Sequence, residues 1–266
     1  MRSTGVQPEG DYPLLRLCRH YGPRVRDGQF YSHETALFLH GAPMPEWPYR
    51  PRLHVSAHRP QREPRVAGVV GHRLQRRNNL AVPGPQGFAV ESPARAWRQT
   101  GTLWALDDLI AAADFLVTGD TPLATTEELR DEVEIMGDVR GGILKRALAD
   151  VRIGVRSARE TRLRLLLVRS GLPEPHINWI LRDVSGRFVA ELDLAYPRWK
   201  VTPEYDGRVH ADDPEQFAKD GDRWDRIREQ GWDHVRIMKH HMRGSGAVAV
   251  HKVRDALLRA GWTPGR

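Results

Sequence analysis

The spacing of apolar residues along the chain follows two different periods. From Phe188 to Leu194 every second residue is apolar, which is typical of a half-buried strand. After a tight connection at 196–198, residues 200–206 predict a second, antiparallel strand and therefore a hairpin. Residues 103–118 instead place apolar side chains at helical spacing, which predicts a helix.

The same patterns, read with turn and capping residues, predict the remaining elements. We expect strands at 53–55, 66–70, 177–181 and 232–238, a hairpin at 81–90, and helices at 13–19, 34–40, 94–99, from 126, at 140–148, 157–169, 211–230 and 247–260. Gly71, His72 and Arg73 are expected to close the strand at 66–70. Strands and helices together predict an α/β (α+β) fold.

Charge divides the chain into three parts. Residues 1–100 carry 15 Lys and Arg against 7 Asp and Glu, residues 101–154 carry 5 against 11, and residues 155–266 carry 21 against 16. We therefore expect a basic α/β region at 1–100, an acidic helical connector at 101–154 that faces solvent or a basic partner, and a third domain at 155–266. The overall charge of +7 is compatible with binding to nucleic acid, although an Arg-rich composition alone gives the same charge.

Composition also limits the setting in which the protein works. No stretch approaches the roughly 18 uninterrupted apolar residues of a membrane span, and the first residues lack the apolar core of a signal peptide. The single cysteine, Cys18, excludes an internal disulfide and a zinc site built from cysteines. We expect a cytoplasmic protein.

Histidines are frequent in the N-terminal region, at positions 33, 40, 54, 58 and 72. Their spacing matches no compact zinc motif. We therefore interpret them as separate structural or surface residues.

Carboxylates gather on the predicted C-terminal hairpin. Glu204 and Asp206 lie two residues apart and so leave the same face of a strand, and Asp193 on the first strand can share that face. Three converging carboxylates repel one another unless a cation lies between them, and oxygen ligands favour Mg²⁺, with Mn²⁺ as a substitute. The other interpretation is that these acids are solvated on an open sheet face.

The C-terminal part resembles the nuclease-like bacterial domain related to the very-short-patch-repair endonucleases, in the PD-(D/E)xK superfamily. The residues that carry the resemblance are Glu160, GLPEP at 171–175, ELDLAYP at 191–197, EYDG at 204–207, His210, Asp222-Arg223 and Gly231-Trp232. The resemblance implies a restriction-endonuclease-like mixed sheet flanked by helices, with Asp193 and Glu204 as acidic metal ligands. Asp206 stands where that superfamily usually has Lys, and Pro203 removes a strand N–H beside Glu204.

Glu160 has two interpretations. Together with Ser157 it forms a capping-box signature at a helix start. The resemblance instead implies a third acidic group near the metal.

The N-terminal part also resembles a known group. YSHETALFLHGAPMP from Tyr31, then LHV, VVGHR and FAVESPARAW, are similar to the middle region of actinobacterial proteins related to type IV abortive-infection antitoxins. In those relatives a winged helix often precedes this region. Only about thirty residues precede Tyr31 here, so we expect no winged helix in this sequence.

These observations lead to the hypothesis of a metal-dependent DNA endonuclease. Asp193, Glu204 and the Tyr205 carbonyl would hold the ion, and His210 would act as the base because its ordinary pKa suits proton transfer near neutrality. Asp206 would orient His210 or bind a second ion. Candidate phosphate-binding residues are Arg208, Lys219 and Arg223. The competing hypotheses are a nuclease fold kept as a DNA-binding regulator or as a protein partner in a toxin–antitoxin or defence system, and a purely structural partner protein.

Overall fold

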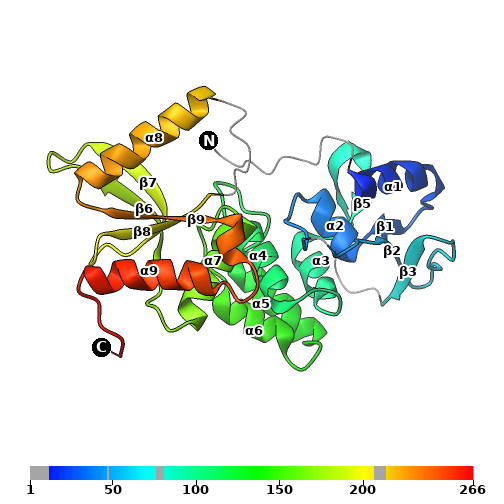
Figure 1. Ribbon diagram of the computed structural model, residues 1–266. Helices are drawn as coiled ribbons and strands as arrows, with labels where there is room; N and C mark the ends of the chain where they lie inside the picture. Colours follow the sequence, from blue (N-terminus) through cyan, green and yellow to red (C-terminus); the bar gives the residue numbers. More distant parts are fainter. Residues whose placement is uncertain (1–11, 47, 76–80, 207–213, 266) are drawn as a thin grey trace. The chain divides into compact units, whose positions relative to one another are not determined.

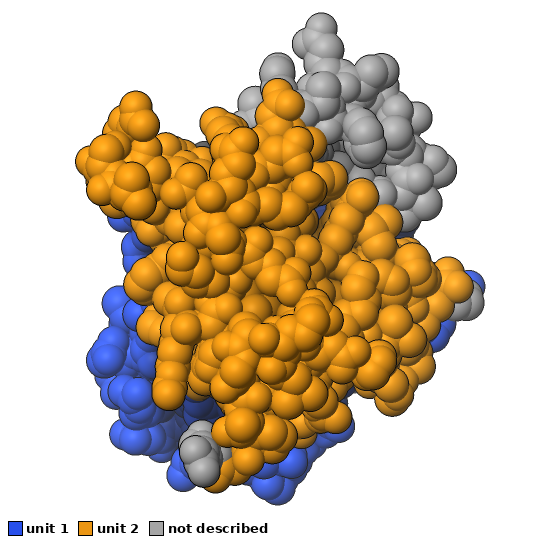
Figure 2. Space-filling view, turned by 60° about the vertical axis from the view of Figure 1, so that its left-hand side comes forward, with its two compact units in different colours: residues 1–158 blue, residues 159–266 orange. Residues whose placement is uncertain are grey.

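The computed structural model describes residues 12–46, 48–75, 81–206 and 214–265. The chain divides into two compact units, here called the N-terminal unit (residues 1–158) and the C-terminal unit (residues 159–266), which Figure 2 distinguishes by colour. Both contain helices and strands, so the predicted α/β class is confirmed. Within the described residues, no helix has the length and apolar character needed to cross a membrane.

A five-stranded mixed sheet forms one part of the N-terminal unit, with the strand order β3-β2-β1-β5-β4. The strands are β1 (Gln29–Tyr31), β2 (Leu53–His58), β3 (Val69–Leu74), β4 (Val82–Pro83) and β5 (Ala89–Val90). β2 and β3 are parallel, and β1 joins them antiparallel to β2. The hairpin predicted at 81–90 is present as the antiparallel pair β4 and β5.

The prediction that residues 71–73 end a strand is wrong, because they lie inside β3. Gly71 is needed there for close approach rather than for a turn. A Cβ atom at this position would lie 2.1 Å from the carbonyl oxygen of Pro64. Glycine inside a strand often marks such a close approach of backbone.

Helices complete the N-terminal unit. They are α1 (Pro13–Tyr21), α2 (His33–Leu39), α3 (Pro93–Thr100), α4 (Leu106–Leu116), α5 (Thr126–Met136) and α6 (Ile143–Asp150), with short 3₁₀ turns at Gly22–Arg24 and Pro85–Gly87. A capping box between Thr125 and Glu128 starts α5. α4 is largely buried, since Leu109 to Asp114 and Leu116 are all buried.

The C-terminal unit consists of strands between helices on two sides. In chain order the elements are α7 (Ala158–Arg169), β6 (His176–Arg182), β7 (Phe188–Ala195), β8 (Val201–Asp206), α8 (Pro214–Glu229), β9 (Asp233–Met238), a 3₁₀ turn (Lys239–Met242) and α9 (Ala247–Arg259). Figure 1 shows α8 on one side of the strands and α9 on the other. Leu163 of α7 and Val253 of α9 share one apolar cluster with Val201, Val235 and Ile237 of the strands.

The predicted hairpin of β7 and β8 is only partly correct. β6 and β7 form an antiparallel ladder, whereas β8 forms its ladder with β9, in parallel. β7 and β8 are joined by the single bridge Tyr196–Val201 and by the Thr202 hydroxyl, which donates to the Leu194 carbonyl at 2.8 Å. Pro203 has no N–H to donate, which is consistent with so short a pairing.

A buried ion pair between α3 and α5 provides a test of the N-terminal fold. Arg95 Nε lies 2.8 Å from Glu132 Oε1, and both side chains are less than a tenth exposed. We expect Glu132→Ala to lower the free energy of unfolding by about 3 kcal/mol, because it leaves the guanidinium buried without this carboxylate. Urea denaturation of the full chain measures the change.

The matched control lies on the same helix. Glu127 of α5 is 3.9 Å from Arg130, and both side chains are at least half exposed, so Glu127→Ala should change stability by less than about 0.5 kcal/mol. Equal losses in the two variants would contradict a special role for the buried pair.

Candidate functional site

The paired strands β8 and β9 carry charged side chains on one face. Glu204 and Asp206 are two residues apart on β8, and His234 and Arg236 are two residues apart on β9. The parallel register places Glu204 opposite Arg236, so all four side chains share a face. Residues of α8 contact this face.

Glu204 lies at the centre of these contacts. Nη1 of Arg223, from α8, is 2.7 and 2.8 Å from the two carboxylate oxygens. His234 Nε2 is 2.9 Å from Oε2. Arg223 also donates from Nη2 to the Glu191 carbonyl on β7 at 2.7 Å. One carboxylate therefore connects β8 to α8 and β9, and through Arg223 to β7.

The charge of Glu204 follows from these contacts. Burial opposes ionisation, but the hydrogen bond with His234 and the positive charge of Arg223 outweigh it, so the pKa of Glu204 lies below its ordinary value. The carboxylate is therefore negative at neutral pH and is balanced by the guanidinium of Arg223.

Asp206 is also paired. Arg236 donates from Nε to Asp206 Oδ2 at 2.7 Å. The guanidinium of Arg236 lies 4.7 Å from the ring centroid of Trp224, and that ring stacks on His234 at 5.4 Å. The sheet face toward α8 is therefore packed. The other interpretation, that these acids are solvated on an open sheet face, does not fit these contacts.

Asp193 lies on β7 between two buried leucines, Leu192 and Leu194. The β6–β7 ladder pairs Ile177 with Leu194 and Trp179 with Leu192, on either side of Asp193. Asn178, opposite Asp193, has a left-handed φ of 50°, which is uncommon for a residue other than glycine.

The two apolar clusters divide at this point. Leu192 packs with Ile227 of α8, whereas Leu194 packs with residues of α7 and α9. The alternation predicted from Phe188 to Leu194 is present in the burial of Ala190, Leu192 and Leu194, although Leu192 and Leu194 belong to different clusters.

The remaining predicted residues are spread over the unit. Glu160 lies in the first turn of α7, and Tyr205 is partly buried in the cluster with α7 and α9, with Arg159 over its ring. Arg208 and His210 lie outside the described residues, as does the side chain of Lys219.

In the described residues, the predicted carboxylates do not lie close enough together to act as three ligands of one ion. Among the described residues, the group of three or more His, Cys, Asp or Glu whose ligand atoms all lie within 4.8 Å of one another consists of His33, His54 and His72. For Glu204 to bind an ion it would have to give up contacts with Arg223 or His234.

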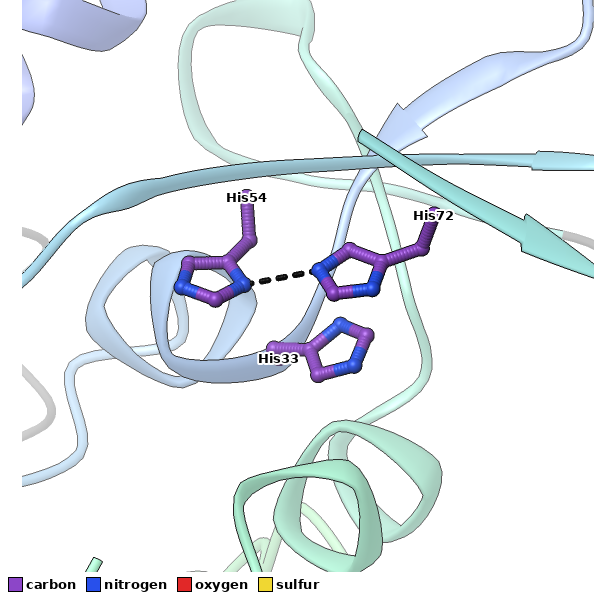
Figure 3. Close-up of side chains that lie close together, drawn as sticks. All are labelled: His33, His54 and His72. Carbon is purple, nitrogen blue, oxygen red and sulfur yellow. Dashed lines mark hydrogen bonds between the residues drawn. The ribbon is translucent and has the colours of Figure 1, made fainter. Parts of the chain in front are cut away.

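The histidine cluster corrects the prediction that these histidines are separate residues. His54 Nδ1 is 2.9 Å from His72 Nε2, and the rings of His33 and His72 are stacked with centroids 3.8 Å apart. Figure 3 shows His54 beside His72 and His33 beneath it. His40 and His58 do have separate positions: His40 contacts the Glu91 carbonyl at 2.7 Å, and His58 packs on Phe30.

Burial favours the neutral form of two of these histidines, His33 and His72. It lowers the pKa of His72 to about 4, with the nearby His54 adding to the effect. The pKa of His33 also lies well below its ordinary value, because of burial and then of the neighbouring His72 and His54. Neutral imidazoles keep a lone pair, which is the form that binds metals.

The sequence carried only a weak signal of this cluster. His54 and His72 converge because β2 and β3 are parallel neighbours, with Ser56 opposite His72. A predicted strand that ended before His72 could not reveal this pairing.

Comparisons with known proteins give distant relatives. The chain is 27% identical over 192 residues to uncharacterized proteins from two strains of Mycobacterium tuberculosis, and the match covers 72% of this chain and 67% of each relative. No family model matches the sequence. No solved structure matches it either.

The pairing of Glu204 gives a prediction about pH. A carboxyl group whose pKa is lowered on folding adds stability above its unfolded pKa of about 4.3, and this stability is lost as the pH falls through the folded value. Glu204→Gln should therefore lower the free energy of unfolding by about 2 kcal/mol at pH 7, and the difference from wild type should shrink below pH 4.

Denaturant titrations at pH 7 and pH 3 measure this difference. Glu229→Gln is the control, because Glu229 is exposed on α8, the helix that carries Arg223. A deficit in Glu204→Gln that stays constant from pH 7 to pH 3 would contradict the assignment.

Proposed function

We propose that the C-terminal unit is a metal-dependent, endonuclease-like domain that hydrolyses phosphodiester bonds of DNA. The observation that carries the proposal is the element order α7-β6-β7-β8-α8-β9-α9 with Asp193 and Glu204 on the successive strands β7 and β8. This arrangement supports the resemblance of residues 155–240 to the very-short-patch-repair type of nuclease. The relatives in Mycobacterium are themselves uncharacterized and add no activity.

Oxygen ligands suit the proposed ion. Asp193, Glu204 and the Tyr205 carbonyl would hold Mg²⁺ or Mn²⁺, which would supply a water of lowered pKa and offset charge on the phosphate. Since both oxygens of Glu204 contact Arg223, binding requires this guanidinium to move.

Arg223 has a suitable role after such a movement. A guanidinium presents a planar fork of donors that matches a phosphate. We propose that Arg223 exchanges Glu204 for a phosphate oxygen when DNA binds, while Asp206 remains paired with Arg236. His210 is the proposed base, and Arg208 and Lys219 are proposed phosphate contacts. We propose a cytoplasmic location, in which this unit would meet DNA.

A second function is favoured by the same ion pairs. Glu204 and Asp206 are both neutralised by side chains of the chain itself. A domain in which these pairs persist would bind DNA, or a protein of a toxin–antitoxin or defence system, without cutting it. The missing Lys at position 206 fits this alternative.

Plasmid cleavage separates the two functions. We expect the full chain to nick supercoiled DNA with Mg²⁺ or Mn²⁺, and EDTA to abolish the reaction. Asp193→Asn should lower the rate at least about 100-fold, because the remaining amide is a poor ligand for a hard cation. Asp233→Asn is the matched control, since Asp233 lies on β9 and is paired with Arg259 at the surface.

The absence of cleavage with both ions would overturn the enzyme proposal. Binding should then be measured against salt concentration, because phosphate contacts give a steep linear fall of log K with log salt. A steep slope that Arg223→Ala reduces supports the binding module, and a flat slope supports a structural partner protein.

A further inference from the structure

We propose that His33, His54 and His72 form a binding site for one Zn²⁺ ion in the N-terminal unit. The proposal uses no residue of the C-terminal unit and goes beyond the nuclease function. It concerns a different class of ion from the Mg²⁺ proposed there.

Three separate elements bring the histidines together. His33 is the first residue of α2, His54 lies on β2 and His72 lies on β3. The parallel register pairs His54 with Val70 and Ser56 with His72, so His54 and His72 leave the same face of the sheet. A cluster drawn from three elements is held by the fold rather than by local sequence.

The distances place one nitrogen of each ring within reach of a common ion. One nitrogen of each ring lies within 4.8 Å of the other two. A tetrahedral ion with metal–nitrogen bonds of about 2.05 Å needs its ligand nitrogens about 3.3 Å apart. The 2.9 Å contact of His54 Nδ1 with His72 Nε2 is already shorter than this. The stacked rings of His33 and His72 would turn so that their lone pairs point to a common ion.

The identity of the ligands selects the ion. Three imidazole nitrogens suit Zn²⁺ and related transition metals, whereas Mg²⁺ and Ca²⁺ prefer oxygen. Three protein ligands also leave one of four positions for water or a substrate. His72 is only partly buried, so this fourth position has access to solvent.

A buried carboxylate orients His54. Glu34 is 1% exposed and lies 3.3 Å from His54 Nε2, a contact without hydrogen-bond alignment in the present ring position. A proton on Nε2 toward Glu34 leaves the lone pair on Nδ1, toward the other two rings. A histidine between a carboxylate and a metal is the usual outer-shell arrangement of zinc sites.

Glu34 is itself held firmly. Its Oε1 accepts from the Arg52 amide at 2.7 Å, and its Oε2 accepts from Trp104 Nε1 at 2.9 Å and from the Tyr49 hydroxyl. These donors keep the carboxylate in place whether or not an ion is bound.

His33 is held in a strained position. Its φ is 53°, and a left-handed residue other than glycine persists only where its surroundings fix it. Its backbone N–H donates to Gln99 Oε1 at 2.9 Å, and its Nδ1 lies 2.9 Å from Ser32 Oγ. Nε2 therefore remains as the ligand atom.

Metal binding by the untagged full-length chain tests the proposal. After removal of metals with EDTA, calorimetric titration with Zn²⁺ should show one equivalent bound, and Zn²⁺ should raise the thermal midpoint by several degrees. His72→Ala should weaken Zn²⁺ binding by more than roughly 100-fold. Loss of a residue that only hydrogen-bonds to a metal ligand weakens binding by less than this. His20→Ala, an exposed histidine on α1, should bind as wild type does.

A ligand exchange distinguishes coordination from damage to the fold. His72→Cys should retain one ion, and with Co²⁺ it should add a thiolate-to-cobalt absorption band that wild type lacks. Thermal melts without metal establish that each variant folds. Less than stoichiometric Zn²⁺ in wild type, or equal binding by wild type and His72→Ala, would overturn the site.

Discussion

The pairing of Glu204 with Arg223 and His234 is the interaction on which the C-terminal unit depends. Moving a carboxylate out of water costs several kcal/mol unless cations and donors compensate it. Here the compensation comes from α8 and β9, and the same guanidinium reaches a carbonyl of β7. The positions of four elements are therefore linked to one charge that lies between them.

A similar constraint operates in the N-terminal unit at Glu34. It is deeply buried and receives donors from a backbone amide, a tyrosine and a tryptophan. The side chains beside the buried carboxylate differ between the two units. Glu204 contacts an arginine, which stays charged at every relevant pH, as well as the imidazole of His234, whereas Glu34 lies beside the imidazole of His54.

The sequence predicted local structure better than it predicted which elements meet. Helices such as Leu106–Leu116 and Ala247–Arg259 follow from apolar spacing, because that pattern is a property of one segment. The parallel pairing of β2 with β3 and of β8 with β9 depends on residues far apart in the chain. The histidine cluster results from such a pairing, and local spacing does not encode it.

The acidic residues illustrate the same limit in another way. That Glu204 and Asp206 share a face follows from the period of a strand and is present in the structure. Their partners Arg223 and Arg236 come from α8 and β9, and only the folded chain shows that these cations meet the carboxylates. Asp193 is different again, because the leucines on either side of it pack in different clusters, which the spacing of one strand does not encode.

The passage of β7 between two apolar clusters has a consequence for how the C-terminal unit opens. Leu192 and Leu194 are two residues apart, yet one belongs to the cluster with α8 and the other to the cluster with α7 and α9. β7 therefore cannot separate from α8 alone, or from α7 and α9 alone, without disturbing the other cluster. Amide hydrogens on both sides of the strands should therefore exchange through one shared opening, so that the unit behaves as a single cooperative block.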